Sequence, residues 1–329
     1  MRVVSLLPSA TETLAALLQF PLQQPFSDLP PVRLVGRSHE CDHPASVTRL
    51  PALTSQTTDY PSQGASATDA LVSASLSANK PLYHLDADRL RALEPDLILT
   101  QDLCSVCSID LDSVRAIADS LDPPARVLSF NPATIEAVFD DILTLGRALA
   151  REDSAKRFVG DLRNRFFLAT DLAVPYAPSP TVAFLDWPDP LYIAGHWTPA
   201  LIERAGGSHP LNPTSAHAQT NTTSASAPPS RRITPEELLS AAPDRLILCP
   251  CGLNLDQTRA EAARLLSHDW FRSLPAVKNQ HVALVDGNQM FNRPSHRLVD
   301  AFEWLAAWIN DRPDRMPADF PWEPLERTG

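Results

Sequence analysis

The chain has 329 residues, with 39 acidic side chains against 28 Lys and Arg and a formal net charge of −11. This acidic balance argues against a general nucleic-acid binder, because the neutralisation of phosphates requires surplus Lys and Arg. Hydrophobic residues make up 44% of the chain and charged residues 20%, a globular composition at a length that allows two ordinary domains.

Short apolar runs alternate with helical patterns along the chain, and this alternation favours α/β layers. The runs are apolar nearly throughout, as expected of strands that are buried on both faces of a parallel sheet. The predicted strands span residues 2–7, 33–38, 96–100, 126–130, 181–186, 245–249 and 281–286. Ser9 and Glu12 have the spacing of a capping box, so we expect a helix to begin at Ser9.

An internal repeat indicates two similar lobes. Residues 85–99 and 233–247 both contain an N-cap residue, a short helix that starts with acidic side chains, a Pro–Asp step and an apolar strand. The N-cap residues are Asp86 in the first copy and Thr234 in the second. The alternative is that this arrangement recurs by chance, as it does in α/β proteins. Two related α/β lobes are the more economical interpretation.

A long helical pattern without proline, at about residues 133–172, separates the two copies of the repeat. At 1.5 Å per residue such a helix would extend for about 55–60 Å. We therefore expect a stiff helical linker. The predicted division is an N-terminal α/β lobe at residues 1–131, a linking helix at 132–174, a C-terminal α/β lobe at 175–310 and a Pro-rich tail without regular structure at 311–329. Polar surface loops are expected at residues 19–31, 55–68 and 212–230.

The candidate site lies where the strands end, because ligands of open parallel sheets bind beyond the carboxyl ends of the strands. Most of the unusual side chains in the chain follow a predicted strand directly. The segments concerned are residues 8–9, 37–42, 101–107, 131, 186–190, 249–252 and 286–291.

Six ordered motifs carry a resemblance to a known family. They are SLLPSATE, GRSHECDHP, PDLILTQDLCSVC, DPLYIAGHWTPALIERAGG, PCGLNLDQTRAEA and VDGNQMFNRPSHRLVDAFEWLA. Together they resemble the signatures of cobalamin-binding proteins, a branch of the helix-linked iron and corrinoid periplasmic-binding-protein superfamily. The resemblance covers nearly the whole chain outside the loops. It implies two Rossmann-like lobes with parallel sheets joined by a long α-helix, the class III arrangement, and cobalamin (vitamin B12) bound between the lobes with no other cofactor.

The resemblance also implies roles for particular side chains. Flat aromatic rings suit a wide macrocycle, so Trp187, Trp197 and Phe291 would pack on the corrin, with Tyr192 near them. The expected partners for polar groups of the ligand are Ser9, Thr11, Arg37, His39, Gln101, Cys104, His196, Cys251, Asn288 and Arg293. The alternatives are that Trp197 and Tyr192 are ordinary core residues and that Ser9 and Thr11 only cap a helix.

The cysteine and histidine residues allow several interpretations. Five cysteines, at 41, 104, 107, 249 and 251, are an odd number and a poor disulfide framework. Only Cys104 and Cys107 have a spacing typical of zinc sites, so pocket-lining or buried thiols are favoured over a structural metal. A sharper hypothesis is that His39, His196 or a thiol coordinates the cobalt of the ligand, since imidazole and thiolate both suit such a metal.

Two acidic residues are candidates for transporter docking. In family members that deliver their ligand to an ABC-type permease, an acidic residue on each lobe meets arginines of the permease. The matching positions are Asp88 and Glu236, although acids in a first helical turn also complement the helix dipole. The N-terminus lacks a signal-peptide core, which predicts a cytoplasmic protein, or a periplasmic one if the chain is a trimmed mature form. We expect a monomer without membrane insertion.

Enzyme motifs are missing from the sequence, which has no GxSxG, Walker or GxGxxG pattern. We therefore expect a non-catalytic protein that binds a corrinoid for uptake or intracellular capture. The alternatives are a binding protein for an iron–siderophore or haem-type chelate, an enzyme that processes tetrapyrroles or corrinoids, and an interaction module that has lost its ligand.

Overall fold

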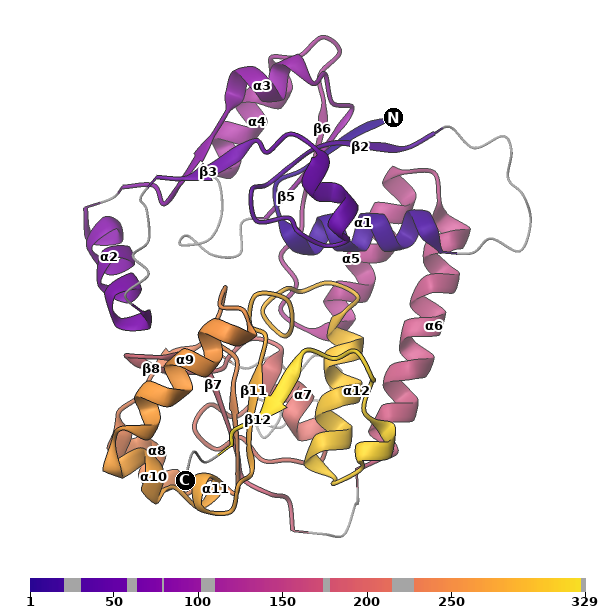
Figure 1. Ribbon diagram of the computed structural model, residues 1–329. Coiled ribbons are helices and arrows are strands. Elements are labelled where there is room, and N and C mark those ends of the chain that lie inside the picture. Colours follow the sequence, from indigo (N-terminus) through magenta and orange to yellow (C-terminus); the bar gives the residue numbers. More distant parts are fainter. Residues whose placement is uncertain are drawn as a thin grey trace. The chain divides into compact units, whose positions relative to one another are not determined.

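The computed structural model describes residues 1–20, 31–57, 64–78, 80–101, 110–173, 178–214 and 228–326. The chain forms two compact units, and each of them is an α/β unit (Figure 1). Unit 1 comprises Met1–Pro61, Ala70–Pro132 and Ala137–Asp161, and unit 2 comprises Ser62–Asp69, Ala133–Glu136 and Leu162–Gly329. Among the described residues, no helix is both long enough and apolar enough to cross a membrane.

Unit 1 contains a parallel sheet with the strand order β2-β1-β5-β6. These strands are β1 (Arg2–Ser5), β2 (Arg33–Arg37), β5 (Leu97–Thr100) and β6 (Arg126–Ser129). Apart from the exposed Arg2, residues of the central strands β1 and β5 are buried, as expected of strands that are covered on both faces. A separate antiparallel pair consists of β3 (Thr54–Gln56) and β4 (Tyr83–Leu85). The other elements are α1 (Pro8–Gln19), η1 (Ala45–Arg49), α3 (Ala87–Ala92) and α4 (Leu111–Asp119), while α2 (Ala65–Ser77) is divided between the two units.

Unit 2 contains a mixed sheet with the strand order β12-β11-β10-β7-β8-β9. Its parallel centre consists of β7 (Val182–Pro188), β10 (Arg245–Leu248) and β11 (Val282–Val285). Antiparallel strands extend both edges, namely β8 (Leu191–Ile193), β9 (Arg231–Arg232) and β12 (Trp322–Pro324). The helices are α7 (Thr198–Arg204), α8 (Pro235–Ala241), α9 (Leu255–Leu266), α10 (Asp269–Ser273), α11 (Pro275–Lys278) and α12 (Leu298–Ile309), followed by η3 (Pro313–Arg315).

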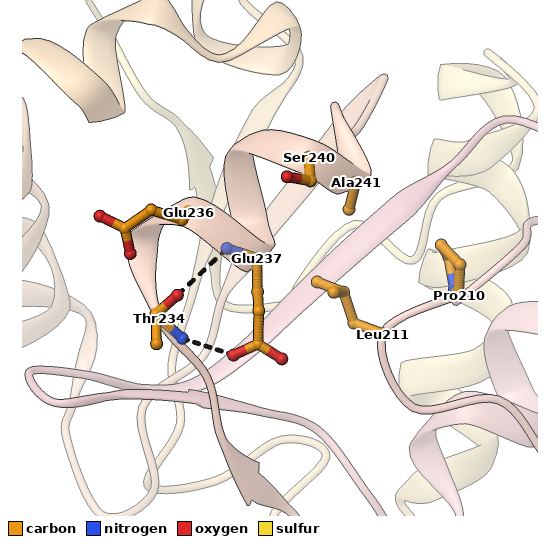
Figure 2. Close-up of a pocket in the computed structure, with 7 residues that line it drawn as sticks. All are labelled: Pro210, Leu211, Thr234, Glu236, Glu237, Ser240 and Ala241. Carbon is orange, nitrogen blue, oxygen red and sulfur yellow. Dashed lines mark hydrogen bonds between the residues drawn. The ribbon is translucent and has the colours of Figure 1, made fainter.

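All seven predicted strands and both copies of the repeat are confirmed. In the first copy, the Asp86 carboxylate accepts a hydrogen bond from the Arg89 backbone N–H at 2.9 Å, and α3 and β5 follow. In the second copy, Thr234 and Glu237 form a capping box at the start of α8, and β10 follows (Figure 2). The match extends to the sheets, because β5 pairs in parallel with the first strand of unit 1 and β10 with the first strand of unit 2.

Two predicted helix features are wrong. The helix expected from 132 to 174 is two helices, α5 (Ile135–Ala148) and α6 (Glu152–Thr170), because Ala150 adopts a left-handed backbone conformation between them. The capping box at Ser9 does not form: α1 begins at Pro8, its N-cap residue is Leu7, and no side chain caps it. Proline is favoured at the first helical position because it has no N–H to satisfy there, so the helix starts one residue before Ser9.

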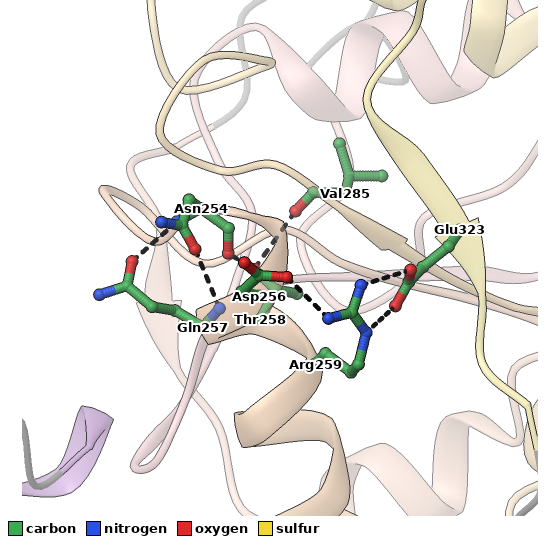
Figure 3. A network of polar contacts seen from close by, with 7 residues as sticks. All are labelled: Asn254, Asp256, Gln257, Thr258, Arg259, Val285 and Glu323. Atoms are coloured by element: carbon green, nitrogen blue, oxygen red, sulfur yellow. Dashed lines mark hydrogen bonds and ion pairs between the residues drawn. The ribbon is translucent and has the colours of Figure 1, made fainter.

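The tail was expected to lack regular structure, and this prediction is also wrong. Residues 322–324 form β12 on the edge of the sheet beside β11. The guanidinium of Arg259 on α9 binds the carboxylate of Glu323 through Nε and Nη2, both at 2.7 Å (Figure 3). In addition, the ring of Phe320 stacks on Trp304 of α12 at 4.8 Å between centroids. Strand pairing, an ion pair and aromatic packing therefore hold the tail on unit 2.

Candidate functional site

The parallel strands of unit 2 end at one edge of the sheet, where polar side chains gather. Leu185 of β7 pairs with Leu248 of β10 in parallel register, so Asp186 and Cys249 follow side by side. Asp286 comes directly after β11, the next strand of the sheet. The sequence analysis predicts the ligand site at this edge, beyond the carboxyl ends of the parallel strands.

Asp286 organises the loop that follows β11. Its Oδ1 accepts hydrogen bonds from the backbone N–H groups of Asn288 and Gln289, each at 3.0 Å. A side chain at Gly287 would not fit, because an added Cβ would lie 2.0 Å from the carbonyl oxygen of Pro250. Burial raises the pKa of Asp286, and these hydrogen bonds act in the opposite direction. The loop is therefore a rigid support for the candidate residues in it.

Two arginines follow this loop and are nearly buried. Arg293 is 7% exposed and its Nη2 donates to Asn288 Oδ1 at 3.2 Å, which brings two predicted ligand-binding residues together. Arg297 is 9% exposed and its Nη2 donates to Gln289 Oε1 at 3.0 Å. Amide oxygens therefore engage both guanidinium groups at this edge.

Among the carboxyl groups at this edge of the sheet, Asp186 has the most strongly shifted pKa. Its Oδ2 accepts a hydrogen bond from Ser230 Oγ at 2.5 Å, and the backbone N–H of Gly195 also donates to it. Burial outweighs these two bonds and raises the pKa of Asp186 to about 7. Burial likewise raises the pKa of the neighbouring Cys249 thiol, and the charge of Asp186 adds to this effect. At neutral pH the Cys249 side chain is therefore a thiol and not a thiolate.

The four predicted aromatic residues fall into two pairs. Trp187 and Tyr192 face each other across β7 and β8, and both remain partly exposed. The Trp187 indole N–H donates to the carbonyl oxygen of Asp189 at 3.1 Å, which fixes the ring. By contrast, Trp197 is 7% exposed and Phe291 only 1%. The Trp197 indole N–H donates to the carbonyl oxygen of Phe291 at 2.7 Å, so this second pair is packed inside unit 2.

Backbone strain is present at two of the candidate residues. His196 and Phe291 have φ angles of 54° and 59°, a left-handed conformation that is uncommon for residues other than glycine. Such strain persists where the surrounding structure over-determines it, and it is concentrated at functional sites. The carbonyl oxygen of Pro228 accepts a hydrogen bond from the His196 backbone N–H at 3.0 Å.

In unit 1, the candidate residues after β2 form a hydrogen-bonded cluster. The guanidinium of Arg37 donates to the carbonyl oxygens of Ser38 and His39, at 2.8 and 3.1 Å, so it shapes its own loop. His39 Nδ1 lies 2.7 Å from Thr54 Oγ1, and its ring lies 5.6 Å from that of Tyr83. Burial lowers the pKa of His39; Glu40 opposes this effect and Arg37 adds to it.

The remaining candidates of unit 1 are placed differently from one another. Ser9 and Thr11 lie inside α1 and are buried, and Thr11 Oγ1 is 3.0 Å from Cys41 Sγ. Gln101 follows β5 and is partly exposed. Cys104 and Cys107 lie outside the described residues. The predicted ligand contacts of all these residues stay predictions.

Among the described residues, the cysteines Cys41, Cys249 and Cys251 form no disulfide. Cys251 is exposed, and its backbone N–H donates to the carbonyl oxygen of Asp186 at 3.0 Å. Within that same part of the chain, no group of three or more His, Cys, Asp or Glu side chains has the geometry to hold a metal ion.

The two candidate docking residues lie on surface helices. Asp88 on α3 is exposed and pairs with Arg91 at 2.9 Å. Glu236 on α8 is exposed and lines a cavity of about 460 Å³, whose other lining residues are Pro210, Leu211, Thr234, Glu237, Ser240 and Ala241 (Figure 2). Because Glu237 accepts from Thr234 and Arg231, its carboxylate is already bound, whereas that of Glu236 points away from the capping box (Figure 2).

Sequence reasoning missed two residues that shape the site. Ser230 binds Asp186 but follows a polar stretch that looks like an ordinary loop. Asn292 donates from Nδ2 to the carbonyl oxygens of Gly287 and Cys249, at 2.9 and 3.2 Å, and so joins the ends of two strands. The sequence signal available for Ser230 was its position: it ends the Pro-Pro-Ser sequence at residues 228–230 and directly precedes β9.

Comparison with known proteins identifies one family model and many solved structures. The model, described as periplasmic binding protein, matches residues 3–288. No curated protein sequence matches the chain significantly. A periplasmic haem-binding protein from Pseudomonas aeruginosa has a TM-score of 0.66 and 20% identity, covering 100% of this chain and 99% of its own.

Two further solved structures are similar. The periplasmic vitamin B12-binding protein BtuF of Vibrio cholerae has a TM-score of 0.60 and 18% identity, covering 94% of this chain and 97% of its own. An ABC transporter substrate-binding protein from Listeria monocytogenes has a TM-score of 0.63 and 19% identity, covering 94% and 98%. At these identities the likeness establishes the two-lobed α/β fold and leaves the ligand open.

Proposed function

Because this chain belongs to the periplasmic binding protein family, we propose that it captures a corrinoid, cobalamin, for delivery to a transporter. The family consists of substrate-binding proteins, which bind small molecules for ABC transporters and do not convert them. Delivery is thus the family's task, and the identity of the ligand is the part that we infer from the site.

The pairing of Trp187 with Tyr192 is the observation that carries the proposal. Both rings stay partly exposed at the end of β7, beyond the polar residues at the edge of the sheet. The hydrogen bond to the Asp189 carbonyl oxygen holds the Trp187 indole in one orientation before any ligand arrives. A rigid flat ring buries the face of a wide macrocycle at little cost in conformational entropy.

The polar groups of the edge favour a ligand with amide side arms. Asn288 and Gln289 supply amide groups, and the guanidinium groups of Arg293 and Arg297 are bound to them. The carboxyl groups of Asp186 and Asp286 lie at the same edge. This environment suits the neutral propionamide arms of cobalamin better than the carboxylates of an anionic chelate, which attract unpaired arginines.

A haem-type chelate is the second candidate, because unit 1 offers side chains that bind iron. The rings of His39 and Tyr83 lie 5.6 Å apart, and histidine and tyrosine are both axial ligands of haem iron in proteins. Solved haem-binding proteins share this fold, as the Pseudomonas aeruginosa structure illustrates. The two candidates predict different outcomes in one titration.

That experiment is calorimetric titration of the purified chain with cyanocobalamin, hydroxocobalamin and haemin. We expect one-to-one binding of both cobalamins. The Trp187→Ala variant should bind cyanocobalamin about tenfold more weakly, which corresponds to about 1.4 kcal/mol, while Trp187→Phe should retain most of the affinity. Trp270→Phe is the matched control, since Trp270 packs on Phe271 of α10. Binding of haemin without binding of cobalamin would replace the proposal with its alternative.

We also propose that Asp88 and Glu236 are the residues that dock on the permease. They occupy corresponding positions of the repeat, each in the first turn of its helix, and both are exposed. Exposed carboxylates at matching positions of two similar lobes suit a partner that presents a basic residue to each lobe.

A further inference from the structure

The segment Pro228–Ser230 lies against the loop that follows β8. The His196 backbone N–H donates directly to Pro228 O at 3.0 Å. Asn212 bridges the two segments, because its Nδ2 donates to Ala194 O at 3.0 Å and to Pro229 O at 3.2 Å. We call residues 228–230 the return arm, because they lead from the stretch after Thr214 into β9.

Asp186 and Gly195 fix the return arm further. Ser230 Oγ donates to Asp186 Oδ2, and the backbone N–H of Gly195 donates to the same carboxylate. The backbones approach so closely that a Cβ at Gly195 would lie 2.2 Å from the Ser230 nitrogen and 2.4 Å from the Pro228 carbonyl oxygen. Glycine is therefore required at position 195, and the arm and the loop form one rigid unit.

This arrangement forces His196 into a strained backbone conformation. A left-handed conformation costs a residue other than glycine about 1–2 kcal/mol, and φ at His196 is 54°. The imidazole is half-buried beside Trp197, with 5.7 Å between ring centroids, and it makes no hydrogen bond to any described residue. Burial lowers its pKa, so the ring is neutral at pH 7 and has a free nitrogen lone pair.

Two other histidines of the described chain, His39 and His209, are engaged differently. His39 has Nδ1 at 2.7 Å from Thr54 Oγ1, and its Nε2 is shielded from solvent. His209 is fully buried, and its Nδ1 lies 2.9 Å from the Val182 carbonyl oxygen. His196 therefore combines a neutral imidazole, partial exposure and a strained backbone next to Gly195, whose N–H donates to Asp186.

We propose that His196 coordinates the metal ion of the bound ligand, and that the return arm positions it for this role. The inference rests on the proposed function, since the metal arrives with the ligand. On cobalamin the step is a ligand exchange: an imidazole nitrogen donates its lone pair to cobalt, and the bound water leaves with its own electron pair. No electron is transferred and no other reactant is needed.

Hydroxocobalamin and cyanocobalamin distinguish coordination from mere binding. The water of hydroxocobalamin in its aquo form exchanges with imidazole, whereas cyanide holds its position on cobalt. We expect the wild-type chain to shift the visible spectrum of bound hydroxocobalamin and to leave that of bound cyanocobalamin unchanged. Both ligands should bind one-to-one in calorimetry.

Two substitutions at His196 preserve the backbone. Asparagine and glycine both tolerate a left-handed conformation, so the His196→Asn and His196→Gly variants should fold. Both should still bind cyanocobalamin but lose the spectral shift with hydroxocobalamin, and affinity for hydroxocobalamin should fall by about 10- to 100-fold.

A matched control is His281→Asn, since His281 is exposed and precedes β11 at the opposite edge of the same sheet. It should leave the shift unchanged. Ser230→Ala tests the return arm: without the bond to Asp186 we expect a smaller shift and about tenfold weaker binding of hydroxocobalamin, with cyanocobalamin binding retained.

The outcomes separate the two claims. If wild-type protein binds both cobalamins and the hydroxocobalamin spectrum stays unchanged, or if the shift survives His196→Asn and disappears in Cys251→Ser, the role of His196 is refuted while the proposed function stands. If neither cobalamin binds, both claims fail together. Loss of the shift in His196→Asn and His196→Gly, with cyanocobalamin binding retained and the shift unchanged in His281→Asn, supports the proposal.

Discussion

Asp96 and Asp244 make the same pair of hydrogen bonds, each to the backbone beside the first strand of its own unit. The Asp96 backbone N–H donates to Arg2 O at 2.9 Å, and its carboxylate accepts from the Arg2 N–H at 2.6 Å. Asp244 binds Thr181 in the same way, at 2.9 and 2.8 Å. The Pro–Asp step of the repeat therefore fixes a helix–strand unit to the strand beside it.

Removal of either carboxylate should destabilise the chain. We expect Asp96→Ala and Asp244→Ala each to lower the free energy of unfolding by about 1–3 kcal/mol, the cost of losing a hydrogen bond to a charged acceptor. Asp112→Ala is the control: this side chain is 91% exposed and its pair with Arg115 is long, at 3.8 Å. Urea unfolding followed by circular dichroism measures all three, and equal effects at positions 96 and 112 would contradict the prediction.

The repeat and the seven core strands could be predicted because their signals are local. An N-cap, a Pro–Asp step and an apolar run each specify structure within a few residues. The short edge strands β8, β9 and β12 carry no such signal, since they contain two or three residues and depend on pairing with a neighbour. Trp322–Pro324, for example, is a strand because β11 offers a free edge to it.

The candidate site could be predicted only in part, for a related reason. Sequence places Trp187 and Trp197 in the same region, but it does not show that the first indole donates to the nearby Asp189 and the second to the distant Phe291. Likewise, the bond between Ser230 and Asp186 joins residues from distant parts of the chain. The ligand contacts assigned to these residues stay predictions until a titration tests them.

The break between α5 and α6 leads to a second prediction. Arg151 N–H donates to Gly146 O at 2.7 Å and Ala150 N–H to Arg147 O at 3.3 Å, which is the hydrogen-bond pattern of a Schellman motif. Ala150 has the left-handed conformation of this motif, with φ of 55°, where glycine is normally found. The missing glycine explains why the sequence pattern predicts one continuous helix.

Ala150→Gly should therefore stabilise the chain, by about 0.5–1 kcal/mol, because glycine adopts this conformation without the steric cost that alanine bears. Gly is normally destabilising inside a helix, so the matched control is Ala148→Gly in the last turn of α5, which should destabilise by about the same amount. Thermal unfolding of the two variants should shift the midpoint in opposite directions. A lower midpoint for Ala150→Gly would show that the position is not strained.

Asp141 on α5 gives a third prediction, on pH dependence. Burial, together with the nearby charge of Asp140, raises the pKa of Asp141 to about 7 from an ordinary value of 3.8. Between these two pH values the folded chain binds more protons at this site than the unfolded chain. The contribution of Asp141 to the free energy of unfolding therefore falls as pH rises from about 4 to about 7, and it is constant above that range.

Asp141→Asn removes this contribution, so the variant should lose less stability than the wild type between pH 4 and pH 7. Asp153→Asn is the control, since Asp153 is 77% exposed at the start of α6. Urea unfolding at pH 5 and at pH 8 provides the comparison. If both variants show the same difference between the two pH values as the wild type, Asp141 does not carry the raised pKa.

Transporter docking gives the last prediction. A lysine in place of either docking residue would place like charges together, because the partner is expected to present basic residues, and such contacts cost several kcal/mol. We expect Asp88→Lys and Glu236→Lys each to reduce protein-dependent uptake of labelled cobalamin about tenfold, with binding of cobalamin to the purified variants unchanged. Asp319→Lys, at another exposed carboxylate of unit 2, is the control.

Because a lysine in a first helical turn also opposes the helix dipole, the stability of each variant is checked by urea unfolding, and its free energy of unfolding must fall by less than about 1 kcal/mol. Normal uptake by a double variant, Asp88→Lys with Glu236→Lys, would exclude both residues from docking.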